Sequence, residues 1–161
     1  MIAGARGAAY GRAVRWMTFQ VLCWLLAALT VRADSARIIK VLPQYLDQKG
    51  HHALRPSLYE RDAYQAYLRK HPELCSALRF EVEWKAAGLK EAVLRVEVRG
   101  NLKGQPQQAV AEGKATRGWL SNWGTARLEG EAFRKLGEIT AWRATLWSEG
   151  RQVAEQKSFL W

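Results

Sequence analysis

The chain has 161 residues, a formal net charge of +10 and a sequence pI near 10.0. That length supports one domain with its own hydrophobic core, and two cysteines are too few for a small scaffold held together by disulfides. The excess of basic residues favours acidic partners such as anionic glycans, lipid head groups or nucleic acid.

The first 33 residues have the three-part pattern of a secretory signal peptide. They begin with basic and no acidic residues, continue with an apolar run over residues 21–31, and end in Val31-Arg32-Ala33, which suits a signal peptidase. The apolar run is about half of the roughly 20 residues that a spanning helix needs, so we expect cleavage and no permanent membrane anchor. The mature chain, residues 34–161, would be exported to a periplasm or to the extracellular space.

Cleavage would remove four arginines and lower the formal net charge from +10 to +6. The remaining basic residues are scattered, which is typical of a solvated surface and, together with export, argues against a nucleic-acid partner. Only Cys75 would remain, so no disulfide could form within the chain. We favour a small buried side chain at Cys75. The alternatives are a reactive thiol and a structural dimer linked through this residue.

The mature chain opens with a predicted strand and a turn. Residues 38–42 are apolar and β-branched, which predicts a strand, and Pro43 blunts its end because proline cannot donate to the ladder. Residues 47–50 have the composition of a turn. We expect residues 51–55 to pair back as a short second strand.

A helix is predicted near residues 57–70. Ser57 and Glu60 have the spacing of a capping box, and Pro72 ends the pattern. A helix of this length is marginal alone, so its apolar face has to dock on the rest of the fold. The residues expected on that face are Tyr59, Ala63, Ala66 and Tyr67.

After the helix the hydrophobic period changes to two. Residues 78–86 and 94–99 alternate apolar and polar side chains, and residues 100–107 read as a loop. Further strands are predicted at residues 109–116, 126–132, 139–147 and 152–160. Six to eight short strands predict a mainly β fold, a single antiparallel two-layer sandwich of immunoglobulin-like type with one helix. Its expected core aromatics are Phe80, Trp84 and Trp142. No linker or repeat divides residues 34–161, so one domain is expected.

Three stretches carry a resemblance that goes beyond periodicity. They are Leu42–Asp47, Arg61–Gln65 and Gln156–Trp161. Together with the central strands they resemble an uncharacterised group of small exported bacterial proteins. The resemblance implies export and an immunoglobulin-like or fibronectin-III-like sandwich. It carries over no catalytic or binding residue.

The loop around Trp119 and Trp123 is the main candidate binding site. Two tryptophans four residues apart, in a setting of glycine, serine and asparagine, predict an aromatic platform for a sugar ring or a peptide. Arg117 and Arg127 flank the loop. The more ordinary outcome is that the tryptophans close one end of the sandwich. Trp147 is a further candidate, because in its strand it faces away from the predicted core and would mark an interaction surface if exposed.

Catalytic and metal sites are weakly indicated. His51 and His52, with Asp47 nearby, match no metal-site spacing, and adjacent strand residues point to opposite faces, so a solvated turn is favoured. Pro72 separates His71 from Cys75, which argues against a thiolate–imidazole pair. No nucleophile motif or phosphate loop is present, and no cofactor is expected.

Near the start of the helix, Arg61 could anchor an acidic ligand. We favour the simpler alternative, in which Asp62 complements the helix dipole and Arg61 makes a surface ion pair.

These patterns favour an exported, non-enzymatic binding module that contacts an envelope protein or an anionic glycan through exposed tryptophans and arginines. An exposed strand edge would be a second route to a peptide partner. One alternative is an enzyme or accessory protein that acts on an envelope polymer. The other is the structural dimer linked through Cys75.

Overall fold

The computed structural model describes residues 36–161, so the signal peptide expected at residues 1–33 lies outside the described part of the chain. The elements follow one another as β1 (Arg37–Asp47), α2 (Leu58–Lys70), the 3₁₀ helix η1 (Pro72–Leu74), β2 (Cys75–Lys85), β3 (Glu91–Leu102), β4 (Gln105–Thr116), β5 (Asn122–Glu129), α3 (Gly130–Leu136), β6 (Glu138–Ser148) and β7 (Arg151–Lys157). Within residues 36–161 no helix has the length and apolar character that crossing a membrane requires.

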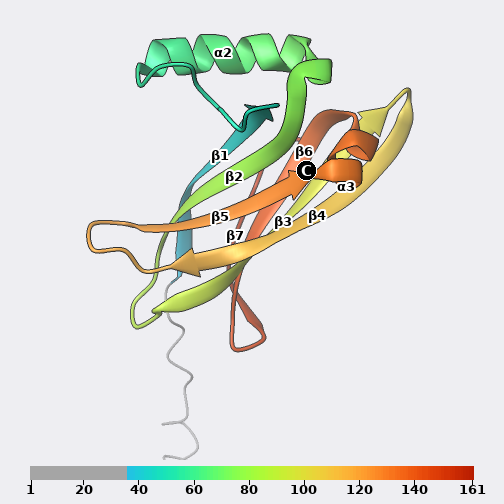
Figure 1. Ribbon diagram of the computed structural model, residues 1–161. Coiled ribbons are helices and arrows are strands. Elements are labelled where there is room, and N and C mark those ends of the chain that lie inside the picture. Colours follow the sequence, from blue (N-terminus) through green and yellow to red (C-terminus); the bar gives the residue numbers. More distant parts are fainter. Residues whose placement is uncertain (1–35) are drawn as a thin grey trace, which may run out of the picture. The chain divides into compact units, whose positions relative to one another are not determined.

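The seven described strands form one curled antiparallel sheet in the order β1-β2-β5-β4-β3-β6-β7 (Figure 1). The prediction of a mainly β fold with six to eight strands and a helix near residues 57–70 is confirmed. The two-layer immunoglobulin-like sandwich is not confirmed, because all described strands belong to a single sheet shaped as a half-barrel. Alternation shows that each strand has one dry face. Two sheets packed together and one sheet curled around its own core both satisfy that pattern.

The curl depends on a close approach of β4 and β5. Ala115 of β4 lies opposite Gly124 of β5, and the pairing between these strands is short. Gly113 lies so near β5 that a Cβ atom at this position would overlap the carbonyl oxygen of Thr125. Glycine and alanine therefore let β4 cross β5 closely, which bends the sheet.

The core lies on the concave face of the sheet. Along β2 every second side chain points inward and is at most 1% exposed, namely Leu78, Phe80, Val82 and Trp84. Phe80 and Trp84 therefore lie in the core as predicted. Trp142 is half-buried and meets the Phe80 ring at a steep angle, with ring centroids 6.5 Å apart.

Two local predictions near the helix are wrong. Residues 51–55 form an irregular loop and not a second strand, because the side of β1 away from β2 is occupied in part by a helix side chain. The capping box is also absent. Ser57 makes no side-chain capping bond, and Glu60 lies 3.4 Å from Arg55 instead of reaching back to Ser57.

Two strand boundaries also differ from the prediction. The expected loop at residues 100–107 shrinks to a tight turn at Lys103 and Gly104, both at positive φ, because β3 and β4 pair up to that turn. The alternation over residues 126–132 breaks at Gly130, where α3 begins. Helix α3 buries Phe133 and Leu136 against the sheet, a contact that depends on distant residues and leaves no local signal.

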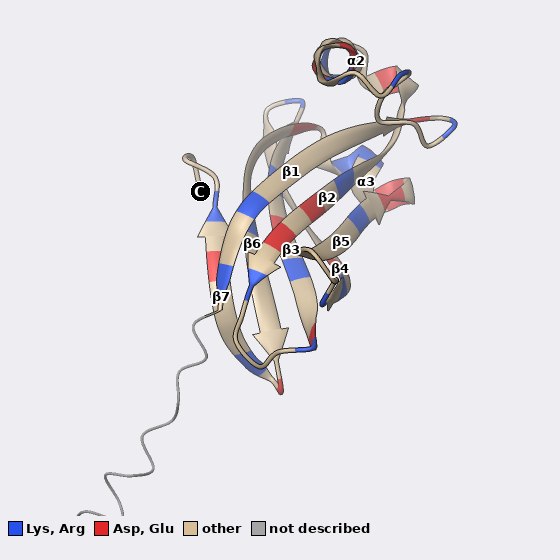
Figure 2. Ribbon diagram, turned by 90° about the vertical axis from the view of Figure 1, so that its left-hand side faces the viewer, with Lys and Arg blue, Asp and Glu red and all other residues tan. Residues whose placement is uncertain are grey.

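Helix α2 docks through a face other than the predicted one. Gln65 and Leu68 are buried, whereas Tyr59 is 83% and Tyr67 47% exposed, and Ala63 and Ala66 are exposed as well. The helix lies across one end of β1 and β2, with its far side turned away from the sheet (Figures 1 and 2).

Gln65 explains the choice of docking face. Its side-chain oxygen accepts from the backbone N–H of Tyr45 at 2.8 Å, and its amide donates to the Tyr45 carbonyl at 2.9 Å and to the His52 carbonyl at 2.8 Å. One side chain thus provides partners for both backbone groups of Tyr45 at the open edge of β1. Without Gln65 these groups would lack hydrogen bonds within the fold.

Candidate functional site

The loop between β4 and β5 is shaped by backbone contacts. The Arg117 N–H donates to the Lys90 carbonyl at 2.9 Å, and the Gly118 N–H donates to the Asn122 side chain at 3.2 Å. Gly118 lies so close to Ser121 that a Cβ atom would overlap its carbonyl oxygen. This tight loop leaves no room for side chains inside it, so the side chains at its tip point into solvent.

Trp119 and Leu120 form that tip. Trp119 is 97% exposed and Leu120 is 88% exposed. Trp119 therefore does not close the end of the fold, which was the more ordinary expectation. An apolar pair this exposed at a loop tip is unfavourable in water unless something covers it.

Trp123 has a different environment from Trp119. It lies on the outer face at the start of β5, is 38% exposed, and donates its indole N–H to the Ser121 hydroxyl at 2.8 Å. Its polar atom is used within the loop. The predicted platform of two equivalent tryptophans thus becomes one exposed ring with a second, partly covered ring at its base.

A hollow of about 700 Å³ lies beside this loop. Its lining comes from the start of β1, the end of β2 with the following turn, and the loop itself. These residues are Ala36, Arg37, Glu83, Trp84, Lys85, Ala86, Ala87, Arg117, Gly118, Trp119, Leu120, Ser121 and Asn122. Three of them are basic and one is acidic. Asn122 ties the loop to β2 by donating to the Trp84 carbonyl at 3.2 Å.

Arg127 and Trp147 are not part of this hollow. Arg127 lies further along β5 and pairs with Glu129 at 2.8 Å. Trp147 is half-buried on β6, donates its indole N–H to the Thr145 hydroxyl at 2.9 Å, and lies under the Arg95 guanidinium, 5.4 Å from the ring centroid. Of the predicted binding residues, the structure brings together Trp119, Trp123 and Arg117 in one loop.

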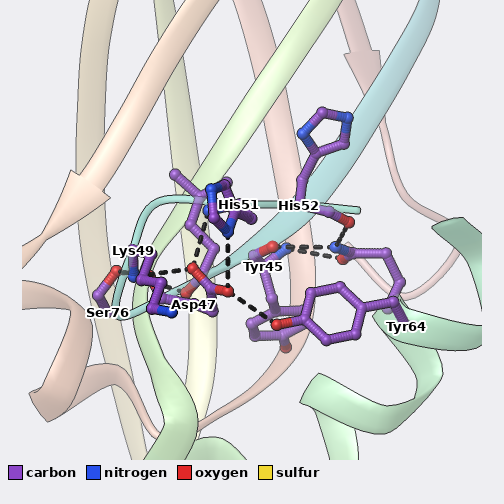
Figure 3. A network of polar contacts seen from close by, with 9 residues as sticks. Tyr45, Asp47, Lys49, His51, His52, Tyr64 and Ser76 are labelled. Carbon is purple, nitrogen blue, oxygen red and sulfur yellow. Dashed lines mark hydrogen bonds and ion pairs between the residues drawn. The ribbon is translucent and has the colours of Figure 1, made fainter. Parts of the chain in front are cut away.

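A polar network occupies the opposite end of β1 (Figure 3). One oxygen of Asp47 accepts from the backbone N–H groups of Lys49 and His51, both at 2.8 Å. The other oxygen accepts from the Tyr64 hydroxyl at 2.8 Å and lies 3.5 Å from Nδ1 of His51. The Ser76 hydroxyl donates to the Asp47 carbonyl, so the loop after β1 is held to both α2 and β2.

The pKa values in this network oppose acid–base chemistry near neutral pH. Burial raises the pKa of Asp47, but the hydrogen bonds from His51, Tyr64 and Lys49 outweigh it and bring the pKa below its ordinary 3.8. Burial, followed by the hydrogen bond to Asp47, raises the pKa of Tyr64 to about 12. Asp47 thus stays ionised and Tyr64 keeps its proton, which suits a structural link.

The rings of the two adjacent histidines point in different directions, and that of His51 lies against Asp47 (Figure 3). His52 Nδ1 lies 3.1 Å from the Arg79 guanidinium, which also donates to the Gln44 side chain at 2.7 Å. Burial and then Arg79 lower the pKa of His52. Within residues 36–161 no three His, Cys, Asp or Glu side chains gather closely enough to hold a metal ion.

The Cys75 thiol reaches the backbone carbonyl of His71 at 3.8 Å, whereas the His71 ring has other partners. Cys75 is buried, as expected, and its thiol donates to the Leu68 carbonyl at 3.4 Å. Burial raises the pKa of this thiol, which lowers the thiolate fraction. The His71 ring packs on Tyr67, with centroids 4.4 Å apart, and its Nδ1 faces Glu73 at 3.1 Å.

The ion pair at the start of α2 is of the simpler kind expected. Arg61 donates twice to one oxygen of Asp62, at 3.0 and 2.8 Å, and Asp62 is largely exposed. Such a pair is a surface feature with a small effect on stability.

The sequence patterns do not predict that Arg37 and Lys85 are neighbours of the tryptophan loop. They reach it because β1 starts, and β2 ends, at the same edge of the sheet, where Arg37 lies opposite Lys85. No local pattern carries that information. In comparisons with known proteins, no protein-family model, curated protein or solved structure matches this chain, so its resemblance to a group of exported proteins stays a prediction.

Proposed function

We propose that this chain is an exported, non-enzymatic binding module of the cell envelope or the extracellular space, which holds a partner at the Trp119 loop. The carrying observation is the exposure of Trp119 and Leu120 beside a hollow of about 700 Å³. An aromatic side chain offers roughly 150–250 Å² for burial, which at about 25 cal/mol per Å² corresponds to about 4–6 kcal/mol before the costs of association.

The charge of the hollow favours an acidic partner. Arg37, Lys85 and Arg117 line it together with one acidic residue, Glu83. The indole N–H of Trp84, which also lines the hollow, is buried without a hydrogen-bond partner among the described residues. A glycan that carries carboxylates fits this set, because sugar rings stack on indole and carboxylates accept from guanidinium and ammonium groups. An acidic protein segment is the alternative partner, because its carboxylates would meet the same basic side chains.

The enzymatic alternative has less support. Its residues would be Asp47, His51, His52 and Cys75. Asp47 contacts His51, and His52 contacts Arg79, so these groups hold the loop after β1 in place. The Cys75 thiol is buried. Their arrangement supports a structural role.

The test is an affinity measurement by titration calorimetry with two probes of similar length, oligogalacturonate and neutral dextran. We expect the acidic glycan to bind and Trp119→Ala to weaken it by about tenfold or more, as for a central aromatic contact. Phe159→Ala is the matched control, because Phe159 is an aromatic residue exposed elsewhere.

Unchanged affinity in Trp119→Ala would reject the loop as the binding site. If neither glycan binds, cross-linking in intact cells decides between the partners. Capture of one protein that is lost in Trp119→Ala would assign a protein partner to the same loop, and capture of none would contradict the proposal.

A further inference from the structure

We propose that α2 is a self-association surface that pairs with α2 of a second copy of this chain in antiparallel orientation. The starting observation is the helix face that points away from the sheet. Tyr59 is 83% and Tyr67 47% exposed there, and Ala63 and Ala66 between them are exposed too. An amphipathic helix normally buries its apolar stripe, and here Tyr59, Ala63 and Ala66 stay exposed within residues 36–161, whereas Tyr67 at the flank packs on the rings of Tyr64 and His71.

The stripe is geometrically suited to a second helix. Tyr59, Ala63, Ala66 and Lys70 follow the spacing i, i+4, i+7 and i+11, so they lie in one row. The row is opposite Gln65 and Leu68, through which α2 attaches to its own sheet. The far side of α2 is therefore open for contact along its whole length (Figures 1 and 2).

In an antiparallel pair with its two-fold axis between Ala63 and Ala66, this row of one copy packs against the same row of the second copy. Ala63 of one copy then faces Ala66 of the other, and two small side chains let the helices approach closely. At each end, Tyr59 faces Lys70 of the second copy. A lysine ammonium beside a tyrosine ring is a favourable cation–π contact.

The flanks of the row are also complementary. A two-fold rotation that reverses the helix direction brings like flanks together, so the flank with Asp62 and Arg69 meets the same flank of the second copy. Asp62 then lies two residues, about 3 Å along the axis, from Arg69 of the second copy. On the other flank Glu60 lies equally near the Tyr67 hydroxyl.

The basic end of α2 is available for such pairs. Asp62 is 69% exposed although it contacts Arg61, and neither Arg69 nor Lys70 has an ion-pair partner among the described residues. A parallel pair would instead set Lys70 against Lys70 and bring the flank with Asp62 against the flank with Glu60 of the second copy. Like charges at that distance repel, so the charge pattern specifies the antiparallel form.

The same pattern distinguishes a second copy from other occupants. A membrane with anionic lipids would attract the basic end of α2 and repel Glu60 and Asp62 at the other end. A second α2 satisfies both ends at once. One helix face is small compared with the 1,200–2,000 Å² of a standard interface, so we expect a reversible dimer with a dissociation constant of roughly 10–100 µM.

The oligomeric state tests this arrangement. It is measured by sedimentation equilibrium on the protein that is recovered after expression of the full chain. We expect Asp62→Arg to place like charges beside Arg69 and to weaken the dimer by about tenfold or more, and Arg69→Asp to do the same beside Asp62. The double variant exchanges the charges and should restore the dimer. A monomeric wild type, or a dimer unaffected by either single change, would overturn the proposal.

A second variant tests the contact at the centre. Ala66→Arg places a long charged side chain beside the two-fold axis, against Ala63 of the second copy, and should abolish the dimer. Ala132→Arg is the matched control, because Ala132 is exposed on α3. Circular dichroism checks that each variant keeps its fold. Trp119→Ala should leave the dimer intact, so failure of the binding proposal and failure of this one are separable.

Discussion

The two ends of the half-barrel differ in how they use polar groups. At the α2 end, the side chains of Asp47 and Gln65 form hydrogen bonds inside the fold. These bonds link β1, the following loop and the helix. At the Trp119 end the loop is held by three hydrogen bonds that involve its backbone or Asn122, and its largest side chains face solvent. The first end has features that stabilise the fold, and the second has features that suit contact with a partner.

This contrast teaches that exposure and chemistry have to be considered together. Histidines, a carboxylate and a tyrosine gather at the α2 end, yet the Asp47 carboxylate, the Tyr64 hydroxyl and Nδ1 of both His51 and His52 already have partners within the fold. The Trp119 end has few reactive groups, but it has exposed apolar area and, beside a hollow, basic side chains without an ion-pair partner among the described residues. Binding needs such unsatisfied surface.

The largest expected effect is at Gln65. Gln65→Leu would leave the Tyr45 N–H and carbonyl and the His52 carbonyl without their partners, and each buried orphan group costs about 1–3 kcal/mol. Because these three groups are only partly buried, we expect a loss below the full sum, a fall in the free energy of unfolding of roughly 2–4 kcal/mol in urea titrations. Gln48→Leu is the matched control, because Gln48 is exposed and should change stability by less than about 0.5 kcal/mol. Equal effects in the two variants would contradict the role assigned to Gln65.

A smaller effect, one that depends on pH, is expected at Asp47. Because the pKa of Asp47 is lower in the folded state, its contribution to stability is complete above the unfolded pKa, near 3.8, and is lost as pH falls through the folded pKa. Unfolding measured between pH 2 and pH 7 should therefore show a steeper loss at low pH in the wild type than in Asp47→Asn. Parallel profiles would show that the carboxylate gains nothing from its hydrogen bonds.

The smallest effect on stability is expected at Trp119. Its side chain is 97% exposed, so Trp119→Ala should change the free energy of unfolding by less than about 0.5 kcal/mol. A loss above about 2 kcal/mol in the same urea titration would mean that the ring is covered in solution. In that case the contrast between the two ends would fail, and the binding proposal with it.

Much of the fold was predictable because local sequence patterns determine where its strands and its longer helix form. The alternation in residues 78–86 and 94–99 predicted β2 and β3 with their buried faces, and the segment before Pro72 predicted α2. The candidate site was predictable only in part. The Trp119 loop was identified from composition, but Arg37 and Lys85 join it through strand pairing over long sequence separations.

The apolar stripe of α2 shows the limit of pattern reasoning most clearly. Tyr59, Ala63 and Ala66 predicted a docking face, yet the helix attaches through Gln65, whose amide satisfies the open edge of β1. A hydrophobic pattern shows where apolar side chains lie along the helix. It contains no information about the backbone N–H and carbonyl groups at a strand edge that need hydrogen-bond partners. The unmet hydrogen bonds of a strand edge can outweigh a modest apolar face.

By itself, the sequence determined the mainly β class, the alternation of faces, the helix and the burial of Phe80 and Trp84, since each follows from local periodicity and side-chain chemistry. Only the tertiary structure decided that the strands join one curled sheet, that α2 turns its tyrosines outward, and that basic residues from β1 and β2 meet the Trp119 loop. Those features depend on which strand edges pair across the chain, and periodicity along one strand contains no information about its neighbours.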